Sequence, residues 1–185
     1  MNHSRIILSK LDERLIKPTT LILYGRAALA LGFDPPLEAA FLSRDVDVIL
    51  TSAQSLALDE DLEFWSALEA ANTDLEPNGL YMTHLFDEHQ VILRPNWLEH
   101  LVAISTPELR HLTLFRPHAL DLLLTKMMRG PDPQDMMDAA FIIQNAGLTH
   151  AEIVEAIKSS RLPAIPELQT LFDQAVPAVL ALQGN

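Results

Sequence analysis

The sequence contains no cysteine and no long apolar run, and these two absences exclude several classes of protein. Without cysteine, its 185 residues form no disulfides and offer no thiolate metal ligand and no thiol nucleophile. No apolar stretch approaches the roughly 20 residues that a membrane span needs. The first residues mix charged with apolar side chains and lack a small-residue cleavage site, so no signal peptide is expected. We therefore expect a cytoplasmic protein that has no membrane partner.

Basic residues are scarce, because 13 lysines and arginines stand against 25 acidic residues, for a formal net charge of −12. None of the basic residues lies between Asp45 and Leu93, where acidic residues accumulate. Duplex nucleic acid is bound largely through neutralisation of its phosphates, so this distribution disfavours a large nucleic-acid footprint. The simplest interpretation of the acidic block is a solvated face. Basic residues precede and follow this block in the sequence, so the sequence is compatible with a local basic patch.

Several catalytic signatures are also missing. The chain has no Gly-x-Ser-x-Gly elbow, no Walker-type phosphate loop and no pair of histidines four residues apart. A hydrophobic content of 49% nevertheless suffices for a folded core. The chemistry must therefore be sought among the acidic and basic side chains.

The hydrophobic pattern predicts strands mixed with helices first and helices only afterwards. This order indicates an α/β or α+β fold, in which a mixed sheet flanked by helices over residues 1–116 precedes a C-terminal helical region over 117–185. The helical region either packs on this head or continues the same domain. Strands are expected at 19–24, 45–51, 79–86, 89–95 and 110–115. Helices are expected at 6–15, 26–33, 58–72, 117–130, 134–147 and 150–160 and after Pro166, and a loop at 34–41.

Asp45 and Asp47 lie two residues apart on a predicted strand, so their side chains point to one face while Val46 and Val48 face the core. Two carboxylates in this arrangement can bind Mg²⁺ or Mn²⁺ through oxygen and leave positions for water and substrate phosphates. An isolated acid-x-acid pair is more often a solubility feature of a strand. The surrounding pattern therefore decides between these interpretations.

Two further features accompany the acidic strand. The first predicted strand ends at Gly25 and turns into a helix, a geometry that exposes backbone N–H groups to an anion, and the bulky Arg26 follows the glycine. Far downstream, Lys126 lies along an apolar helix stripe, where snorkelling to solvent is the alternative to a functional role. Asp135 and Asp138 begin the next helix, and a favourable interaction with its N-terminus is their simplest role.

Together these residues resemble the pattern of the DNA polymerase β-type nucleotidyltransferase superfamily. The similar branch is that of the minimal bacterial nucleotidyltransferase-like proteins related to abortive-infection toxins. In that branch a Gly-Gly or Gly-Ser turn precedes a Thr-x-Asp-apolar-Asp strand, and a helix with Lys and Arg precedes an Asp-x-x-Asp helix. The resemblance covers roughly residues 5–145 and rests on order and spacing. The matching positions are Gly25-Arg26, Ser43-Arg44-Asp45-Val46-Asp47, Lys126, Arg129, Asp135 and Asp138.

The resemblance implies a nucleotidyl transfer from a nucleoside triphosphate to a hydroxyl of RNA, protein or a small molecule by a two-metal mechanism. It implies that Asp45 and Asp47 hold the metal ions, that Lys126 contacts a phosphate, and that Asp135 orients Lys126 or assists the acceptor. It also implies a toxin–antitoxin-like context with a cognate protein partner. The implied nucleotide-binding positions are Gly25, Arg26, Ser43, Lys126 and Arg129.

Three departures from the family pattern keep a second interpretation open. Arg26 replaces the second small residue of the turn and either clamps a phosphate, fills its pocket or points to solvent. Phe41 replaces an arginine expected four residues before the first metal aspartate. The strand predicted at 89–95 carries no third carboxylate, although Asp87 and Glu88 lie nearby. The alternatives are a catalytically degenerate relative that binds a nucleotide or a protein, and an interaction domain without nucleotide affinity.

Overall fold

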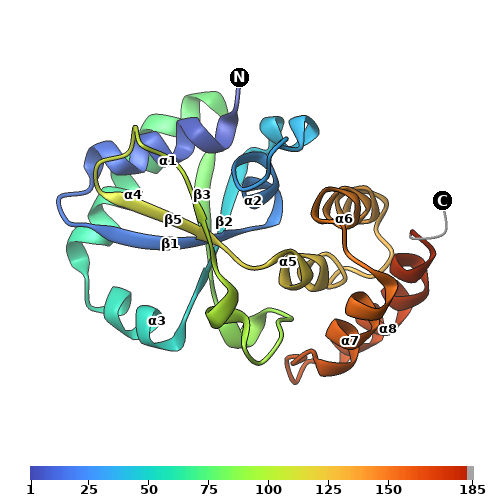
Figure 1. The fold of residues 1–185 in the computed structure, drawn as a ribbon. Helices are drawn as coiled ribbons and strands as arrows, with labels where there is room; N and C mark the ends of the chain where they lie inside the picture. Colours follow the sequence, from blue (N-terminus) through green and yellow to red (C-terminus); the bar gives the residue numbers. More distant parts are fainter. Residues whose placement is uncertain (183–185) are drawn as a thin grey trace. The chain divides into compact units, whose positions relative to one another are not determined.

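The computed structural model of the chain describes residues 1–182, apart from the side chains of Thr83 and His84. The fold is α+β, as the sequence predicted, with a mixed sheet, flanking helices and a helical C-terminal region (Figure 1). The chain forms two compact units, and each is described here by itself. Unit 1 comprises Met1–Asp87 and Val102–Arg116, and unit 2 comprises Glu88–Leu101 and Pro117–Asn185.

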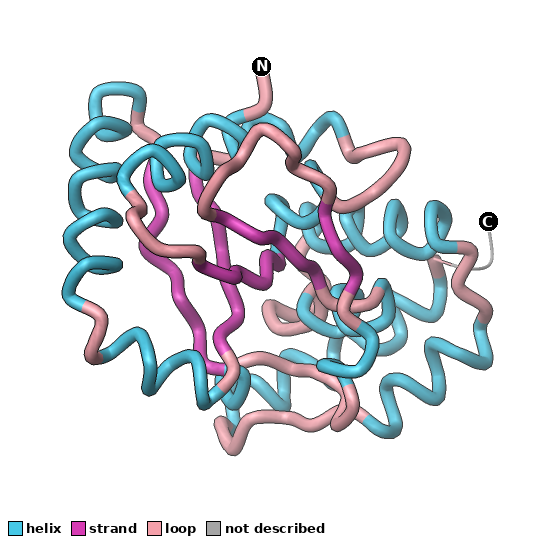
Figure 2. The backbone as a smooth tube through the Cα atoms, turned by 60° about the vertical axis from the view of Figure 1, so that its left-hand side comes forward, coloured by secondary structure: helices cyan, strands magenta, loops and turns pink. Residues whose placement is uncertain are grey.

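Unit 1 is built on a five-stranded mixed sheet with the strand order β3-β2-β1-β5-β4. The β1–β2 and β4–β5 pairs are antiparallel, whereas the β1–β5 and β2–β3 pairs are parallel. The strands twist along the sheet, as Figure 2 shows. Their bounds are β1 Thr19–Tyr24, β2 Asp45–Leu50, β3 Tyr81–Asp87, β4 Val102–Ile104 and β5 Leu112–Arg116.

Helices cover the sheet of unit 1 because its central strands are apolar on both faces. Leu21, Ile22 and Leu23 of β1 are all buried, as expected for a strand packed between two layers. Helix α1 packs against α4 and β2, α2 against β1 and β2, and α3 against β2 and α4. The helices are α1 His3–Arg14, α2 Gly25–Leu31, α3 Ser52–Asp59 and α4 Leu62–Leu75, with 3-10 turns η1 Glu38–Leu42 and η2 Glu76–Asn78.

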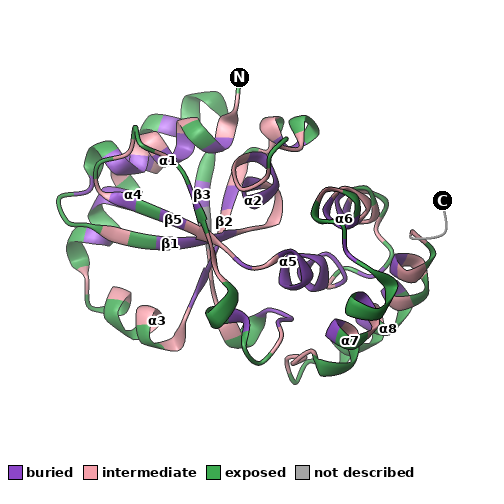
Figure 3. Ribbon diagram, in the orientation of Figure 1, coloured by how far each residue is buried: buried purple, intermediate pink, exposed green. Residues whose placement is uncertain are grey.

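Unit 2 is a helical cluster around α5, whose residues are all buried (Figure 3). Helix α5 packs against α6 and α7, and α8 packs against the same two helices. A bridge between Leu93 and Arg161 holds the segment 88–101 in this unit. The helices are α5 Ala119–Thr125, α6 Pro133–Ala146, α7 His150–Ser159 and α8 Pro166–Ala181, with 3-10 turns η3 Glu88–Gln90 and η4 Trp97–His100.

A buried ion pair supports the attachment of the 88–101 segment. The Arg94 guanidinium donates to both oxygens of Asp121 on α5, at 3.1 Å from Nε and 2.7 Å from Nη2, and the Arg94 backbone N–H donates to the same carboxylate. The Asp121 side chain is fully buried. A bidentate contact of this kind fixes both partners in one geometry.

The prediction of a strand at 89–95 is wrong, because this stretch contains part of η3 and an irregular segment that belongs to unit 2. Val91, Ile92 and Leu93 are fully buried there. A short apolar run indicates burial but does not distinguish a buried strand from another buried segment. The strand that flanks β2 on the side opposite β1 is β3.

Other element boundaries also differ from those predicted. The helix predicted at 58–72 begins at Leu62, because Asp61 caps its first turn, and a separate helix α3 precedes it behind a Thr51–Gln54 capping box. The predicted loop at 34–41 contains the start of η1, and the short strand β4 was not predicted. Along the described chain no helix is both long and apolar enough to cross a membrane.

Candidate functional site

The first group of predicted residues lies where β1 ends beside the beginning of β2. In the antiparallel β1–β2 ladder Tyr24 is opposite Asp47. The turn at Gly25, which directly follows Tyr24, therefore lies beside the Asp47 side chain.

Gly25 is required at this turn for two reasons. Its φ is +60°, a backbone conformation that glycine adopts without steric cost. A Cβ atom at this position would also lie 2.6 Å from Oδ2 of Asp47, which is closer than such atoms approach. The absence of a side chain thus lets the Asp47 carboxylate pack directly against the backbone of the turn.

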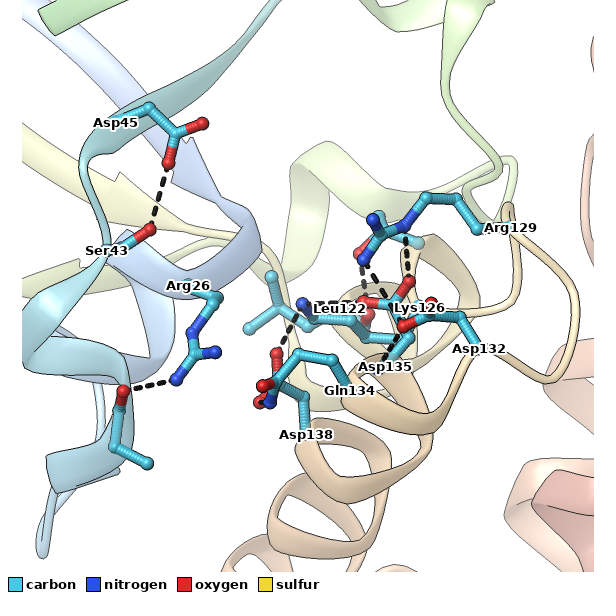
Figure 4. A network of polar contacts seen from close by, with 12 residues as sticks. Arg26, Ser43, Asp45, Leu122, Lys126, Arg129, Asp132, Gln134, Asp135 and Asp138 are labelled. Atoms are coloured by element: carbon cyan, nitrogen blue, oxygen red, sulfur yellow. Dashed lines mark hydrogen bonds and ion pairs between the residues drawn. The ribbon is translucent and has the colours of Figure 1, made fainter.

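The two carboxylates occupy the face of β2 that the alternation predicted. Val46 and Val48 are fully buried in the core, whereas Asp45 and Asp47 are half-buried. The hydroxyl of Ser43 donates to Oδ1 of Asp45 at 2.9 Å (Figure 4), so it orients the first carboxylate.

A register shift in the β2–β3 ladder also lies between these two positions. Asp45 is opposite Tyr81 and Asp47 is opposite His84, so two steps along β2 face three along β3. Such bulges commonly re-aim side chains near functional sites.

Tyr24 belongs to this group, although no motif identified it. Burial raises the pKa of its phenol, and the negative charges of Asp47 and Asp45 raise it further. Its ring packs edge-on against Phe86, with the ring centroids 5.7 Å apart. Tyr24 is therefore a neutral, fixed phenol beside the carboxylates, and its position as the last strand residue before Gly25 was the only sequence signal.

Arg26 is anchored inside unit 1. Its guanidinium donates to the backbone carbonyl of Ala39 in η1 (Figure 4), and Nε is buried without a hydrogen-bond partner among the residues described. Phe41, the other departure from the family pattern, lies in the same 3-10 turn. Arg26 therefore links the glycine turn to η1 and does not extend freely into solvent.

The second group of predicted residues lies within unit 2, where Lys126 at the end of α5 faces the first turns of α6. Its Nζ lies 2.7 Å from Oδ2 of Asp138 and 3.2 Å from Oδ1 of Asp135 (Figure 4). The Lys126 side chain is only 8% exposed. Asp138 is thus nearer to Lys126 than Asp135, for which the resemblance implied that it orients this lysine or assists the acceptor.

Further contacts complete this network. Nε of Arg129 donates to Oδ2 of Asp135 at 2.7 Å, and this bond raises the pKa of Arg129. The amide of Gln134 donates to Oδ1 of Asp138 at 3.2 Å, and Asp132 caps α6 by accepting from the Asp135 N–H. Lys126 is therefore already paired with two buried carboxylates, with which an incoming phosphate would compete.

Among the described side chains, no third carboxylate lies with Asp45 and Asp47 as a metal ligand. No group of three acidic or histidine side chains that could hold a metal ion occurs among them. The register partner of Asp47 on the neighbouring strand is His84, whose side chain lies outside the description. Asp87 pairs with Leu50 at the far end of β2. Glu88 lies in unit 2, where it accepts from Nε1 of Trp97 at 3.1 Å.

The structure thus brings the predicted residues together in two groups, one in each unit. Asp45 and Asp47 are the residues of the first group that could hold a magnesium ion, which usually binds one or two protein carboxylates and keeps water or phosphate oxygens as its other ligands. No protein-family model, curated protein or solved structure matches the chain. The functional assignment therefore depends on the residues themselves. The first group is Gly25, Arg26, Ser43, Asp45 and Asp47, and the second is Lys126, Arg129, Asp135 and Asp138.

Proposed function

We propose that unit 1 binds a nucleoside triphosphate together with Mg²⁺ or Mn²⁺ and transfers its nucleotide to a hydroxyl group. The observation that carries this proposal is the packing of the Asp47 carboxylate on the side-chain-free turn at Gly25, with Asp45 beside it on β2. A carboxylate pair beside a turn that begins a helix is suited to a phosphate–metal complex, because the carboxylates can bind the metal and the N–H groups at the start of the helix can donate to phosphate oxygens.

The site residues of unit 1 have separate roles in this proposal. Asp45 and Asp47 supply the metal ligands, and Ser43 holds Asp45 in orientation. When bound, the metal neutralises charge on the phosphates and favours ionisation of the attacking hydroxyl. The hydroxyl oxygen forms a bond to the α-phosphorus, the bond to pyrophosphate breaks, and the hydroxyl proton passes to water. Burial raises the pKa of Tyr24, which disfavours a role as the base.

The acceptor is a hydroxyl of RNA, protein or a small molecule. The net charge of −12 gives no preference to RNA, because phosphate contacts need basic surface. As the resemblance implied, we also propose that Lys126 and Arg129 bind phosphate within unit 2, and that Asp135 orients Lys126 or assists the acceptor.

A second candidate function is favoured by two observations. Arg26 is held by the carbonyl of Ala39 beside the turn, and no third acidic ligand joins the pair among the described side chains. A general base typically contributes about 10²- to 10⁴-fold to a rate, so a site without one can retain binding and lose turnover. The alternative is therefore a nucleotide- or protein-binding module descended from such an enzyme.

Calorimetric titration with each nucleoside triphosphate, with and without Mg²⁺, tests the proposal. The wild-type protein is compared with the double variant Asp45→Asn/Asp47→Asn. The control is the double variant Asp59→Asn/Glu60→Gln, which removes the same number of charges at two exposed positions outside the site. A ligand at 100 times its Kd stabilises the native state by about 2.7 kcal/mol, so a thermal scan should also show the binding.

The expected result is metal-dependent binding that disappears in the Asp45/Asp47 variant and persists in the control. Incubation with a labelled triphosphate and detection of released pyrophosphate then separates transfer from binding alone. Binding without pyrophosphate release supports the second candidate. Absence of binding by every nucleotide in the wild-type protein refutes both nucleotide-based proposals.

A further inference from the structure

A hollow of about 580 Å³ lies in unit 1 between α4 and the edge strand β3, and none of its lining residues belongs to the Gly25–Asp45–Asp47 cluster. Ligand pockets commonly measure about 300–1,000 Å³, so this volume is large enough for recognition. Its apolar wall is formed by Trp65, Leu68, Leu80 and Tyr81, and Glu69 and Glu76 also line it.

Two aromatic side chains stay exposed in this hollow. Trp65 is 39% exposed and Tyr81 is 38% exposed, although both are large apolar groups. The Trp65 ring is fixed, because Nε1 donates to the carbonyl of Leu58 at 2.7 Å and the ring packs edge-on against Phe64. A ligand that contacts this ring meets a wall that needs no ordering, which lowers the entropic cost of binding.

The two carboxylates of the hollow, Glu69 and Glu76, differ from their acidic neighbours in their ion pairing. On the same helix and in the same unit, Glu63 pairs with Lys17 and Asp74 pairs with Arg14. Among the described residues neither Glu69 nor Glu76 forms an ion pair, and no lysine or arginine occurs between residues 45 and 93. The hollow therefore combines exposed aromatic rings with uncompensated negative charge, which is the combination that binds cations.

The edge strand beside the hollow is closed to strand addition at this end. The amide side chain of Asn72 bonds both backbone groups of Met82, donating to its carbonyl at 2.9 Å and accepting from its N–H at 2.8 Å. The N–H of Tyr81 donates to the carbonyl of Arg44. A partner cannot use these backbone groups as a new strand would, so recognition must come from side chains.

We propose that this hollow docks a basic segment of a partner protein, with arginine side chains that stack on Trp65 and Tyr81 and pair with Glu69 and Glu76. A protein segment is favoured over a small cation because the acidic surface continues beyond the hollow. The Trp65–Leu58 bond places the end of α3 beside the ring, and exposed Asp59 and Glu60 follow directly. A segment with several basic residues satisfies both parts of this surface. The proposal uses no residue of the Gly25–Asp45–Asp47 cluster and does not depend on the proposed function.

Fluorescence and calorimetric titration with a short peptide of alternating arginine and alanine residues tests the docking. The same peptide with citrulline in place of arginine keeps the shape and removes the charge. Arginine amide alone serves as the small-cation probe. The variants are Glu69→Gln, Glu76→Gln and their combination, with Glu63→Gln as the control, because Glu63 lies on the same helix outside the hollow and already pairs with Lys17.

The arginine peptide is expected to bind at least tenfold more tightly than the citrulline peptide and than arginine amide. Each Gln variant at 69 or 76 should weaken binding about threefold and the pair about tenfold, as partly exposed ion pairs do, while Glu63→Gln changes it less than twofold. Equal binding of the citrulline peptide, or equal weakening by Glu63→Gln, overturns the proposal. Equal binding of arginine amide also overturns it and assigns the hollow to small organic cations.

Discussion

Replacement of Lys126 by methionine should destabilise unit 2 more than any other single removal of a charge from its network. Lys126 lies between two carboxylates, and the Asp138 side chain is only 1% exposed. Without Lys126, Asp135 still has a second cation, Arg129, at 2.7 Å, whereas among the described residues Asp138 has only the Gln134 amide as a side-chain partner. Removing one partner of a buried ion pair costs about 3–5 kcal/mol, so Lys126→Met should lower the free energy of unfolding by that amount.

Arg129→Met is the matched control, because it also removes a cation that contacts Asp135. The Arg129 side chain is 66% exposed, so its loss should cost only about 1 kcal/mol or less. Combining Lys126→Met with Asp138→Leu removes the uncompensated carboxylate, and the double variant should be more stable than Lys126→Met alone by about 1–3 kcal/mol.

Urea unfolding followed by the fluorescence of Trp97 measures these differences, since Trp97 is 1% exposed and lies in unit 2. A Trp65→Phe background removes the signal of unit 1. A Lys126→Met protein within about 1 kcal/mol of its parent would refute the reasoning, because it would show that the carboxylates do not depend on the lysine. If the predicted loss is found, activity measurements on Lys126 variants must use the stable double variant.

Two further predictions concern unit 1. Gly25→Ala should cost more stability than Gly79→Ala. Both glycines have a positive φ, which costs a residue with a Cβ about 1–2 kcal/mol, but only at Gly25 would the new Cβ also clash with Asp47. Denaturation of both variants measures the difference in their free energies of unfolding, and equal losses would contradict the clash. Burial raises the pKa of Asp12, but backbone N–H bonds from three consecutive residues outweigh it and hold the pKa below its ordinary value of 3.8. Asp12 therefore contributes stability above that pH and loses it as the pH falls through the lowered pKa, so Asp12→Asn should cost about 2–3 kcal/mol at pH 7 and progressively less below pH 4. A pH-independent cost of Asp12→Asn in urea unfolding would contradict this assignment.

Local signals in the sequence determined most of the elements. Gly147 ended α6 in a left-handed conformation, and the Thr149–Glu152 capping box began α7, each through chemistry confined to a few neighbouring residues. The alternation of Asp45 and Asp47 with buried valines was equally local, because side chains on a strand alternate between its faces whatever the strand pairs with.

Only the tertiary structure decided which elements meet, because contacts between distant residues leave no mark on local periodicity. It assigned the apolar run at 91–93 to unit 2 and placed β3 beside β2 on the side opposite β1. It placed Tyr24 beside the carboxylates, and it brought Asp138 closer to Lys126 than Asp135. Burial of a charged or apolar group can be predicted from its type and spacing, but the partner that compensates or covers it depends on the folding of the whole chain.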